Sequence, residues 1–421
     1  MAMAIAIATF TITLAVIASE RLHRTNVALL GAAIVVLLVG EFGQEQAIEA
    51  VDFDTIGLLV GMMILVELTR HTGIYDFIAI RAAQISRGEP LRVVIALAGS
   101  TALLSAFLDN LTTILLIVPV TFMLAHKLEI DAIPLVIIEI VSSNIGGTAT
   151  LIGDPPNIII AGATGRSFNE FIVNLAPIAA TTLVVVIAGL YLYYRPQLRI
   201  EERSRREVME LDAGASIRDS KELRRSGPVL IATVVLFFLH QALHIEPATV
   251  ALTGAAVGLL VTRVPLEEAL AKIEWPTIFF FLGLFVMVGA LKATGAIDHA
   301  AEGISDITGG DRTAELFAIT WIAAAGSALV DNIPFTTAMV PVVEDLQVSG
   351  DDAYWWALAL GACFGGNATI IAAAANVAAS GLTERQGQPI GFLSFMRIGV
   401  PVTLVSMALA SGYLWIRYIA V

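Results

Sequence analysis

The sequence contains few cysteines and few charges. Cys363 is the single cysteine among 421 residues, which excludes an internal disulfide framework and a CxxC metal or redox site. Charged residues make up 14% of the chain, against about 25% in a typical soluble domain. The formal net charge of −13 argues against nucleic acid as a partner, because nucleic-acid-binding surfaces are basic.

The sequence also lacks the motifs of nucleotide chemistry and of catalysis. It has no GxxxxGK[ST] loop and no GxGxxG motif after a strand pattern, so we expect no ATP hydrolysis by this chain alone. His240 and His244 are four residues apart, but a metal site would need further ligands. No nucleophile–base pattern is present either. We therefore predict that the protein is not an enzyme and uses no metal and no cofactor.

Long apolar segments dominate what is present. Hydrophobic residues make up 57% of the chain and the mean hydropathy is +0.83, which is typical of an all-α polytopic protein whose surroundings are the lipid bilayer. Because residues 3–19 lack a positive n-region, we expect a retained helix there and not a signal peptide. The apolar segments of helical length are 3–19, 26–42, 55–69, 92–108, 110–126, 133–162 and 174–194, and then 228–243, 246–262, 276–291, 314–330, 332–346, 355–381 and 398–418.

The second half of the sequence repeats the first at a near-constant offset. VALLGAA at Val27 matches VALTGAA at Val250. The Asp109-Asn110 pair likewise matches Asp331-Asn332. So many matches in register indicate an internal duplication. The predicted divisions are a first repeat at 1–194, a cytoplasmic linker at 195–227 and a second repeat at 228–421.

Two apolar segments, 92–126 and 314–346, carry an Asp-Asn pair near their middle. We predict that each is a re-entrant helical hairpin, which leaves five crossings per repeat and inverts the second repeat relative to the first. If each hairpin instead crosses twice, the number of crossings stays odd and the inversion remains. With the linker inside, all but four of the 24 Lys and Arg residues lie on the cytoplasmic side of the inner membrane, and both termini lie outside. The four exceptions are Arg166, Lys292, Arg312 and Arg417.

The apolar segment 133–162 is interrupted by SSNIGGTATLIGDPPN at 142–157. Glycine and proline pairs cannot continue a helix there, and irregular backbone survives at membrane depth only where protein covers it or a cavity adjoins it. We predict a broken helix, with a second copy within 355–381; the alternative is a loop outside the membrane. Inverted repeats with interrupted helices are typical of secondary transporters.

The hairpin tips and the breaks supply the predicted substrate- and ion-binding residues. A tip and a break can meet in the middle of each half, so we expect two polar clusters, one per half. Half-helix ends and freed carbonyls suit small ions. The predicted residues are Asp109, Asn110, Thr112, Thr113, Asn144, Gly146, Gly147, Thr148, Thr150, Asp154 and Asn157 in the first half, and Asp331, Asn332, Thr336, Thr337, Gly365, Gly366, Asn367, Thr369 and Asn376 in the second.

Four acidic residues carry the predicted chemistry, because a carboxylate inside a membrane is costly and usually functional. Asp109 and Asp331 border the predicted transport site, although each also precedes a helical segment and fits an N-cap. Asp154 has no acidic counterpart in the second half and is the first candidate for proton coupling; its alternative role is capping the second half-helix. Glu139 is the other proton candidate, and its alternative is a pairing with a neighbouring helix. The mixed charge of the linker 195–227 indicates a solvated connection between the two repeats.

Four motifs resemble the ion transporter superfamily: FLDNLTTILLIVPVT at 107–121, SSNIGGTATLIGDPPNIII at 142–160, LVDNIPFTTAMVPVV at 329–343 and GGNAT at 365–369. The chain is most similar to the branch of the arsenical pump permeases (ArsB), the NhaD-type sodium/proton antiporters and the P protein. The resemblance implies a dimerising scaffold domain, a transport domain that moves as an elevator, and export driven by H⁺ or Na⁺ gradients. By analogy with arsenical pumps it also implies a soluble ATPase as a partner for some members.

The resemblance implies efflux of arsenite, antimonite or a similar small inorganic ion. Since one cysteine cannot build a three-thiolate cage, arsenite here would bind as the neutral trihydroxide through Asn and Thr. One alternative is a Na⁺/H⁺ antiporter, although the GDPPN sequence at 153–157 differs from the form associated with NhaD members. The other alternative is an inorganic or carboxylate anion transporter. A passive channel is the remaining class of function. The internal repeat argues against it, because a channel needs a continuous pore and no site that faces the two sides in turn.

Overall fold

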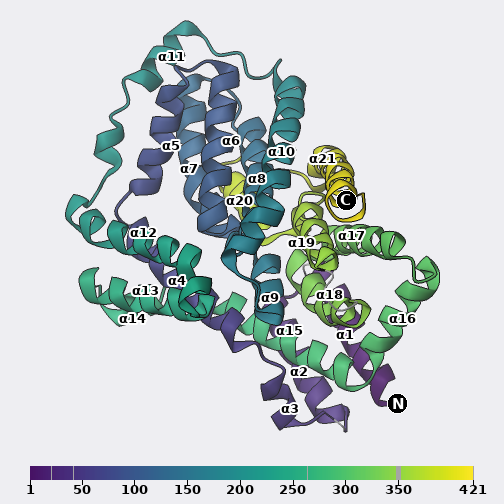
Figure 1. Cartoon of the computed structure of the whole chain (residues 1–421). Helices are drawn as coiled ribbons and strands as arrows, with labels where there is room; N and C mark the ends of the chain where they lie inside the picture. Colours follow the sequence, from purple (N-terminus) through teal and green to yellow (C-terminus); the bar gives the residue numbers. More distant parts are fainter. Residues whose placement is uncertain (20, 41, 263, 348–351, 421) are drawn as a thin grey trace.

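The computed structural model describes residues 1–19, 21–40, 42–262, 264–347 and 352–420, and every regular element in these ranges is a helix (Figure 1). This confirms the predicted all-α class. The first-half helices are α1 Ala2–Ala18, α2 Arg24–Leu38, α3 Gln44–Glu49, α4 Phe53–Arg70, α5 Ile74–Ile85, α6 Pro90–Phe107, α7 Asn110–Leu128, α8 Ile133–Gly147, α9 Pro155–Thr164 and α10 Phe168–Tyr194. Then follow α11 Glu202–Met209, η1 Ala213–Ser216, α12 Ser220–Leu243, α13 Pro247–Thr262, α14 Leu266–Leu270, α15 Trp275–Ala293, α16 Ala296–Thr308, α17 Arg312–Leu329, α18 Asn332–Leu346, α19 Ala353–Gly365, η2 Ile370–Ala372, α20 Ala374–Arg385, α21 Phe392–Leu414 and η3 Trp415–Ile419.

Six helices of the described chain are long and apolar enough to cross a membrane. They are α6, α7, α10, α12, α15 and the C-terminal helix over Phe392–Ile419. Five further apolar helices are shorter, namely α1, α2, α8, α13 and α19. The protein is therefore a multi-pass membrane protein, as its composition predicts.

Six helices form what we call the scaffold layer: α1, α2, α4, α12, α13 and α15. Within it α2 packs on α15 and α4 packs on α13, and the layer lies along the lower side of Figure 1. Small residues permit these contacts. A Cβ atom added to Gly61 would lie 2.6 Å from the backbone of Ala251, and one added to Gly283 would lie 2.8 Å from the backbone of Ala28.

A second group of helices, α6–α10 and α17–α21, forms what we call the core bundle. Its contacts recur in the two halves, with α6 packed on α8 and α17 packed on α19. They also cross between halves, because α9 packs on α18 and α20 packs on α7. The two halves are thus interleaved in one bundle.

Each hairpin turns at an aspartate that caps the returning helix. Asp109 Oδ1 accepts a hydrogen bond from the Thr112 backbone N–H at 2.8 Å, and Asp331 Oδ1 accepts one from Ile333 N–H at 2.9 Å. The predicted capping role is therefore present at both tips. Asp109 also has a φ of +149°, a conformation that costs energy for any residue with a side chain.

The predicted break lies at residues 148–154, between α8 and α9, and its counterpart lies between α19 and α20. In each break an asparagine side chain takes the place of helical backbone donors. Asn157 Nδ2 donates to the carbonyls of Thr148 and Thr150 at 3.1 and 2.8 Å, and Asn376 Nδ2 donates to those of Gly366 and Thr369 at 2.7 and 2.8 Å. The freed carbonyls thus have partners without a continuous helix.

The linker differs from the solvated connection that its polarity suggests. Its helix α11 packs on α5 and α7, and Ser204 and Val208 of that helix are buried. Gln84 Nε2 donates to the Leu211 carbonyl at 2.6 Å, and Arg218 pairs with Asp76 at 2.8 Å. That prediction was wrong because a short amphipathic helix docks on the first hairpin.

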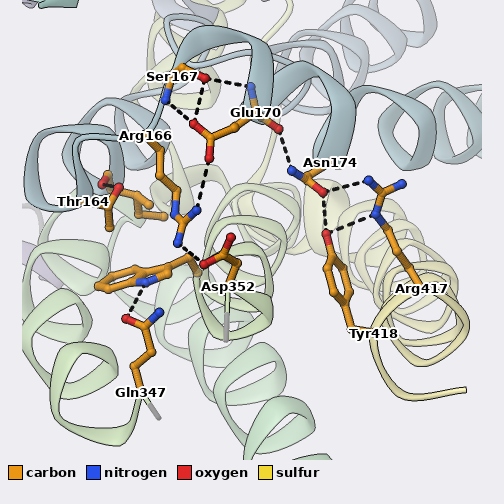
Figure 2. Close-up of polar contacts among 11 residues, drawn as sticks. Thr164, Arg166, Ser167, Glu170, Asn174, Gln347, Asp352, Arg417 and Tyr418 are labelled. Atoms are coloured by element: carbon orange, nitrogen blue, oxygen red, sulfur yellow. Dashed lines mark hydrogen bonds and ion pairs between the residues drawn. The ribbon is translucent and has the colours of Figure 1, made fainter. Parts of the chain in front are cut away.

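A polar network at the start of α10 joins the two halves (Figure 2). Arg166 contacts Asp352 at 2.5 Å and Glu170 at 3.4 Å. Further along α10, the side-chain oxygen of Asn174 accepts hydrogen bonds from Arg417 and Tyr418 at 2.9 and 2.6 Å. These bonds fix α10 of the first half against the C-terminal helices of the second.

Candidate functional site

Asp154 lies where the two hairpin tips meet. Its side chain is 0% exposed, and Oδ1 accepts hydrogen bonds from Asn110 Nδ2 at 3.2 Å and Asn332 Nδ2 at 3.0 Å. Asp154 occupies the N-cap position of α9 but makes no side-chain capping bond there. The alternative that it serves as a helix cap was therefore wrong, and one carboxylate bridges both tips.

Asn144 joins the two breaks. Its Nδ2 donates to Asn367 Oδ1 at 3.1 Å and to Asn376 Oδ1 at 3.0 Å, while its Oδ1 accepts from Asn110 Nδ2 at 3.3 Å. The two predicted clusters are thus a single cluster, which corrects the sequence-based expectation of one per half. We call it the central cluster; its members, all buried, are Asn110, Asn144, Asp154, Asn157, Asn332, Cys363, Asn367 and Asn376.

Two atoms of the central cluster lack a hydrogen-bond partner among the described residues: Asp154 Oδ2 and Asn367 Nδ2. Buried polar atoms in native proteins nearly always have partners. One of the two atoms is an acceptor and the other is a donor. The central cluster can therefore accept a ligand or ion that offers a hydroxyl, a proton or a small cation.

Predicted threonines brace the central cluster. The hydroxyl of Thr150 donates to the Ala106 carbonyl, and Thr369 in the second half donates to Ala328 at 2.8 Å. Thr148 donates to the Asn144 carbonyl at 2.8 Å. The Thr150 and Thr369 bonds each tie a break to the end of the neighbouring hairpin helix.

The hairpin threonines have different roles. Thr336 and Thr337 donate to the backbone of their own helix, at Asn332 O and Ile333 O, and not to a side chain of the central cluster. Thr112 contributes its backbone N–H to the Asp109 cap. The buried Thr113 hydroxyl has no partner among the described residues.

The predicted glycines act through close packing. A Cβ atom on Gly146 would lie 2.3 Å from the Ala102 carbonyl oxygen, and one on Gly365 would lie 2.5 Å from that of Ala324. Gly147 faces the Gly153 carbonyl at 2.5 Å in the same way. Gly366 also offers its carbonyl to Asn376. These positions bring breaks and hairpins into contact and carry no side-chain chemistry.

Arg24 is a site residue that the sequence did not reveal. Its Nη1 lies 3.1 Å from Asp331 Oδ2, and its guanidinium lies over the Phe280 ring at 5.1 Å. Since Arg24 stands at the start of an apolar segment, the sequence indicates only membrane orientation for it. Ser105 and Ser327 were also missed; they donate to the Ser143 and Ala362 carbonyls at 2.7 Å.

Glu139 is buried on α8, where the Thr121 hydroxyl donates to Oε1. Its Oε2 has no partner among the described residues. Its neighbouring-helix partner is thus a hydroxyl and not a cation. Among the described residues, no hydrogen bond joins the Glu139 side chain to the central cluster.

Three cavities are lined by charged residues, and the smallest of them also includes Asn110 of the central cluster. One of about 490 Å³ is bordered by His23, Arg24 and Asp331, and another of about 540 Å³ by Asp52, Lys292 and Glu344. A third, of about 40 Å³, is lined by Arg24, Asp109, Asn110, Glu274 and Thr277 among others. Within the described ranges no group of His, Cys, Asp and Glu side chains has the arrangement of a metal site.

Known proteins resemble this chain over nearly its whole length. The sequence matches the citrate transporter family, CitMHS, over residues 14–361. The uncharacterized transporter Rv2684 of Mycobacterium tuberculosis is 44% identical over 422 residues, which cover 98% of both chains. The P protein of Mus musculus is 32% identical over 96% of this chain and 59% of that protein.

A solved structure has a similar fold. The YdaH transporter of Alcanivorax borkumensis, whose crystal structure is described as having an unusual topology, aligns with a TM-score of 0.58 at 15% sequence identity. The alignment covers 86% of this chain and 85% of that one. These findings support the superfamily resemblance and the relation to the P protein, whereas the arsenical pump and NhaD branches stay predictions.

Proposed function

This chain belongs to the CitMHS citrate transporter family, and from that premise we propose that it couples solute transport to an ion bound at Asp154. As a member it is a secondary transporter. The observation that carries the proposal is the bridging carboxylate, which is buried, accepts from both hairpin tips and leaves Oδ2 without a partner. A proton or Na⁺ at that oxygen would complete its bonding, so H⁺ or Na⁺ is the proposed coupling ion.

We propose efflux of a small hydroxylated inorganic solute, arsenite or antimonite, as the first candidate. The ligand groups of the central cluster are mostly amides, and its two unpartnered atoms are one donor and one acceptor. A hydroxyl group both donates and accepts a hydrogen bond, so a neutral trihydroxide matches this pair.

The second candidate is a carboxylate anion. Arg24 contributes one N–H to Asp331 and borders the cavity of about 490 Å³. A guanidinium has five N–H donors and suits carboxylates, and the family is described as citrate transporters. A Na⁺/H⁺ exchange without another solute is the third outcome that the experiment below separates.

We propose that the halves are inverted repeats and that the core bundle moves against the scaffold layer as an elevator. Support comes from the recurring order of helices and from the exchange of packing partners between halves. The proposed setting is the inner membrane, with the linker in the cytoplasm and the protein as a homodimer.

The deciding experiment is flux in proteoliposomes with an imposed pH gradient, with internal pH recorded. Na⁺, Li⁺, arsenite, antimonite, citrate and small inorganic anions are added in turn. Proton movement with arsenite or antimonite alone supports the first candidate, and movement with citrate or another anion supports the second. Movement with Na⁺ or Li⁺ alone would make the protein a cation antiporter. Unitary currents in a planar bilayer would overturn transport by alternating access.

A further inference from the structure

The Arg24–Asp331 ion pair joins the scaffold layer to a hairpin tip. Arg24 is the first residue of α2, and the Phe280 ring of α15 lies beneath its guanidinium. Asp331 uses one carboxylate oxygen for the turn of its own hairpin and the other for Arg24. The pair therefore couples two bodies that the proposed elevator motion separates.

Arg24 also lines two cavities. The cavity of about 490 Å³ and the cavity of about 40 Å³ share three lining residues, namely Arg24, Leu111 and Ala374. Asn110 of the central cluster lines the smaller one. Arg24 therefore lies between the larger cavity and the small cavity that borders the central cluster.

The Arg24–Asp331 ion pair is partly buried. The Asp331 side chain is 6% exposed and that of Arg24 is 27% exposed. Breaking a partly desolvated pair leaves a carboxylate without its counter-ion, which is costly. The first hairpin has no such lock, since Asp109 has no cation within ion-pair distance in the described chain and has Glu274 beside it in the small cavity.

We propose that the Arg24–Asp331 pair is the gate between the larger cavity and the central cluster. This gate rests on the proposed function only in taking the central cluster as the transport site. Arg24 is a positioning residue, because it acts by holding the hairpin tip closed.

Cys363 provides a reporter for the gate. It is the only cysteine, it is buried, and its Sγ lies 3.7 Å from Asn157 Oδ1 within the central cluster. The full-length protein is treated with a small methanethiosulfonate reagent, and modification of Cys363 is followed by mass spectrometry. No transported solute is needed, so a failed gate and a failed choice of substrate give different results.

We expect Arg24→Gln to raise the modification rate by about tenfold, the factor that about 1.4 kcal/mol of lost closure gives. Asp331→Asn should do the same, and the double variant should add nothing because both changes remove one pair. Arg24→Lys keeps the charge and should retain a slow rate. Cys363→Ser should show no labelling.

Lys292→Gln is the matched control. It removes a second ion pair between the scaffold layer and the same hairpin, Lys292 of α15 with Glu344 of α18 at 2.9 Å, but Lys292 lies away from the shared lining. An unchanged rate in Arg24→Gln would overturn the gate. An equal rise in Lys292→Gln would also overturn it, because loosening the hairpin anywhere would then suffice.

Discussion

At the scale of single residues, the carboxylate of Asp154 is the group to test for ion coupling. Asp154→Asn keeps the shape of the side chain but cannot take up and release a proton. We expect proton-driven flux to fall by about tenfold or more, with solute binding changed far less. The measurements are flux across a series of imposed pH gradients and equilibrium binding of the solute.

Asp154→Glu serves as the control that keeps the titratable group. It should retain a pH-dependent flux at a reduced rate, because the longer side chain displaces the tip amides. A flux in Asp154→Asn with the pH dependence of the natural protein would contradict the coupling role.

The tip aspartates allow charge and capping to be separated. Asn caps helices about as well as Asp, so Asp109→Asn and Asp331→Asn should leave folded, monodisperse protein while each lowers transport by about tenfold or more. Asp311→Asn, at the exposed cap of α17, should leave transport unchanged. Full transport in either tip variant would confine that aspartate to capping.

The sequence predicted these carboxylates because acidic residues in apolar segments stand out. It did not predict Arg24, whose partner Asp331 is distant in sequence and whose position beside a membrane span is ordinary for a cation. Nor did it show that Asp154 faces the tips, since Gly153-Asp154-Pro155 fits an N-cap equally well until the side chain is placed.

At the scale of helices, the contact of α6 with α8 depends on Gly146. Gly146→Ala would place a methyl group 2.3 Å from the Ala102 carbonyl oxygen, so the helices must separate. We expect a loss of about 1–3 kcal/mol, as for overpacked cores, seen as a lower midpoint of thermal unfolding in detergent.

Gly99→Ala is the matched control on α6, since a Cβ atom there would have no described heavy atom within 4 Å beyond its chain neighbours and the nearby backbone of its own helix. That change should be neutral or slightly stabilising. Equal destabilisation by both variants would contradict the contact as the cause, because Gly99→Ala creates no close contact.

The helical elements could largely be predicted, because glycine and proline pairs at 146–156 forbid a continuous helix and apolar length sets the rest. The docking of α11 on α5 and α7 could not be predicted from the sequence. Its residues are mostly charged, and only the side facing α5 and α7 carries Val208 and Ser204, too short a pattern to distinguish from a solvated helix.

At the scale of the whole molecule, a crosslink tests the proposed motion of the core bundle against the scaffold layer. A Cβ atom on Gly162 of α9 would lie 2.5 Å from Thr55 Oγ1 of α4, close enough for a disulfide. We expect oxidised Thr55→Cys/Gly162→Cys protein to lose transport and to regain it with reductant, measured as flux in proteoliposomes.

A crosslink inside the scaffold layer is the control. Gly57→Cys/Ala248→Cys joins α4 to α13, where the corresponding Cβ distance is 3.5 Å, and transport should persist after oxidation. The buried Cys363 can stay in both variants. Transport that survives the Thr55–Gly162 crosslink would contradict relative motion of the two bodies.

The two predicted polar clusters form one cluster because of how the whole molecule packs. The repeat predicts what each half contains, but it does not show that α9 packs on α18 and α20 on α7. Those contacts join residues far apart in sequence, and no local pattern encodes them.

The bridging position of Asp154 has a consequence for energetics across the membrane. The duplication supplies two tips and two breaks, but only one carboxylate stands where both tips meet. If that carboxylate carries one proton per cycle and the solute is neutral, each cycle moves one net charge. Membrane voltage then contributes about 2.3 kcal/mol per 100 mV to every turnover. The exchange would be electrogenic, with its stoichiometry set by a carboxylate that only the first half supplies.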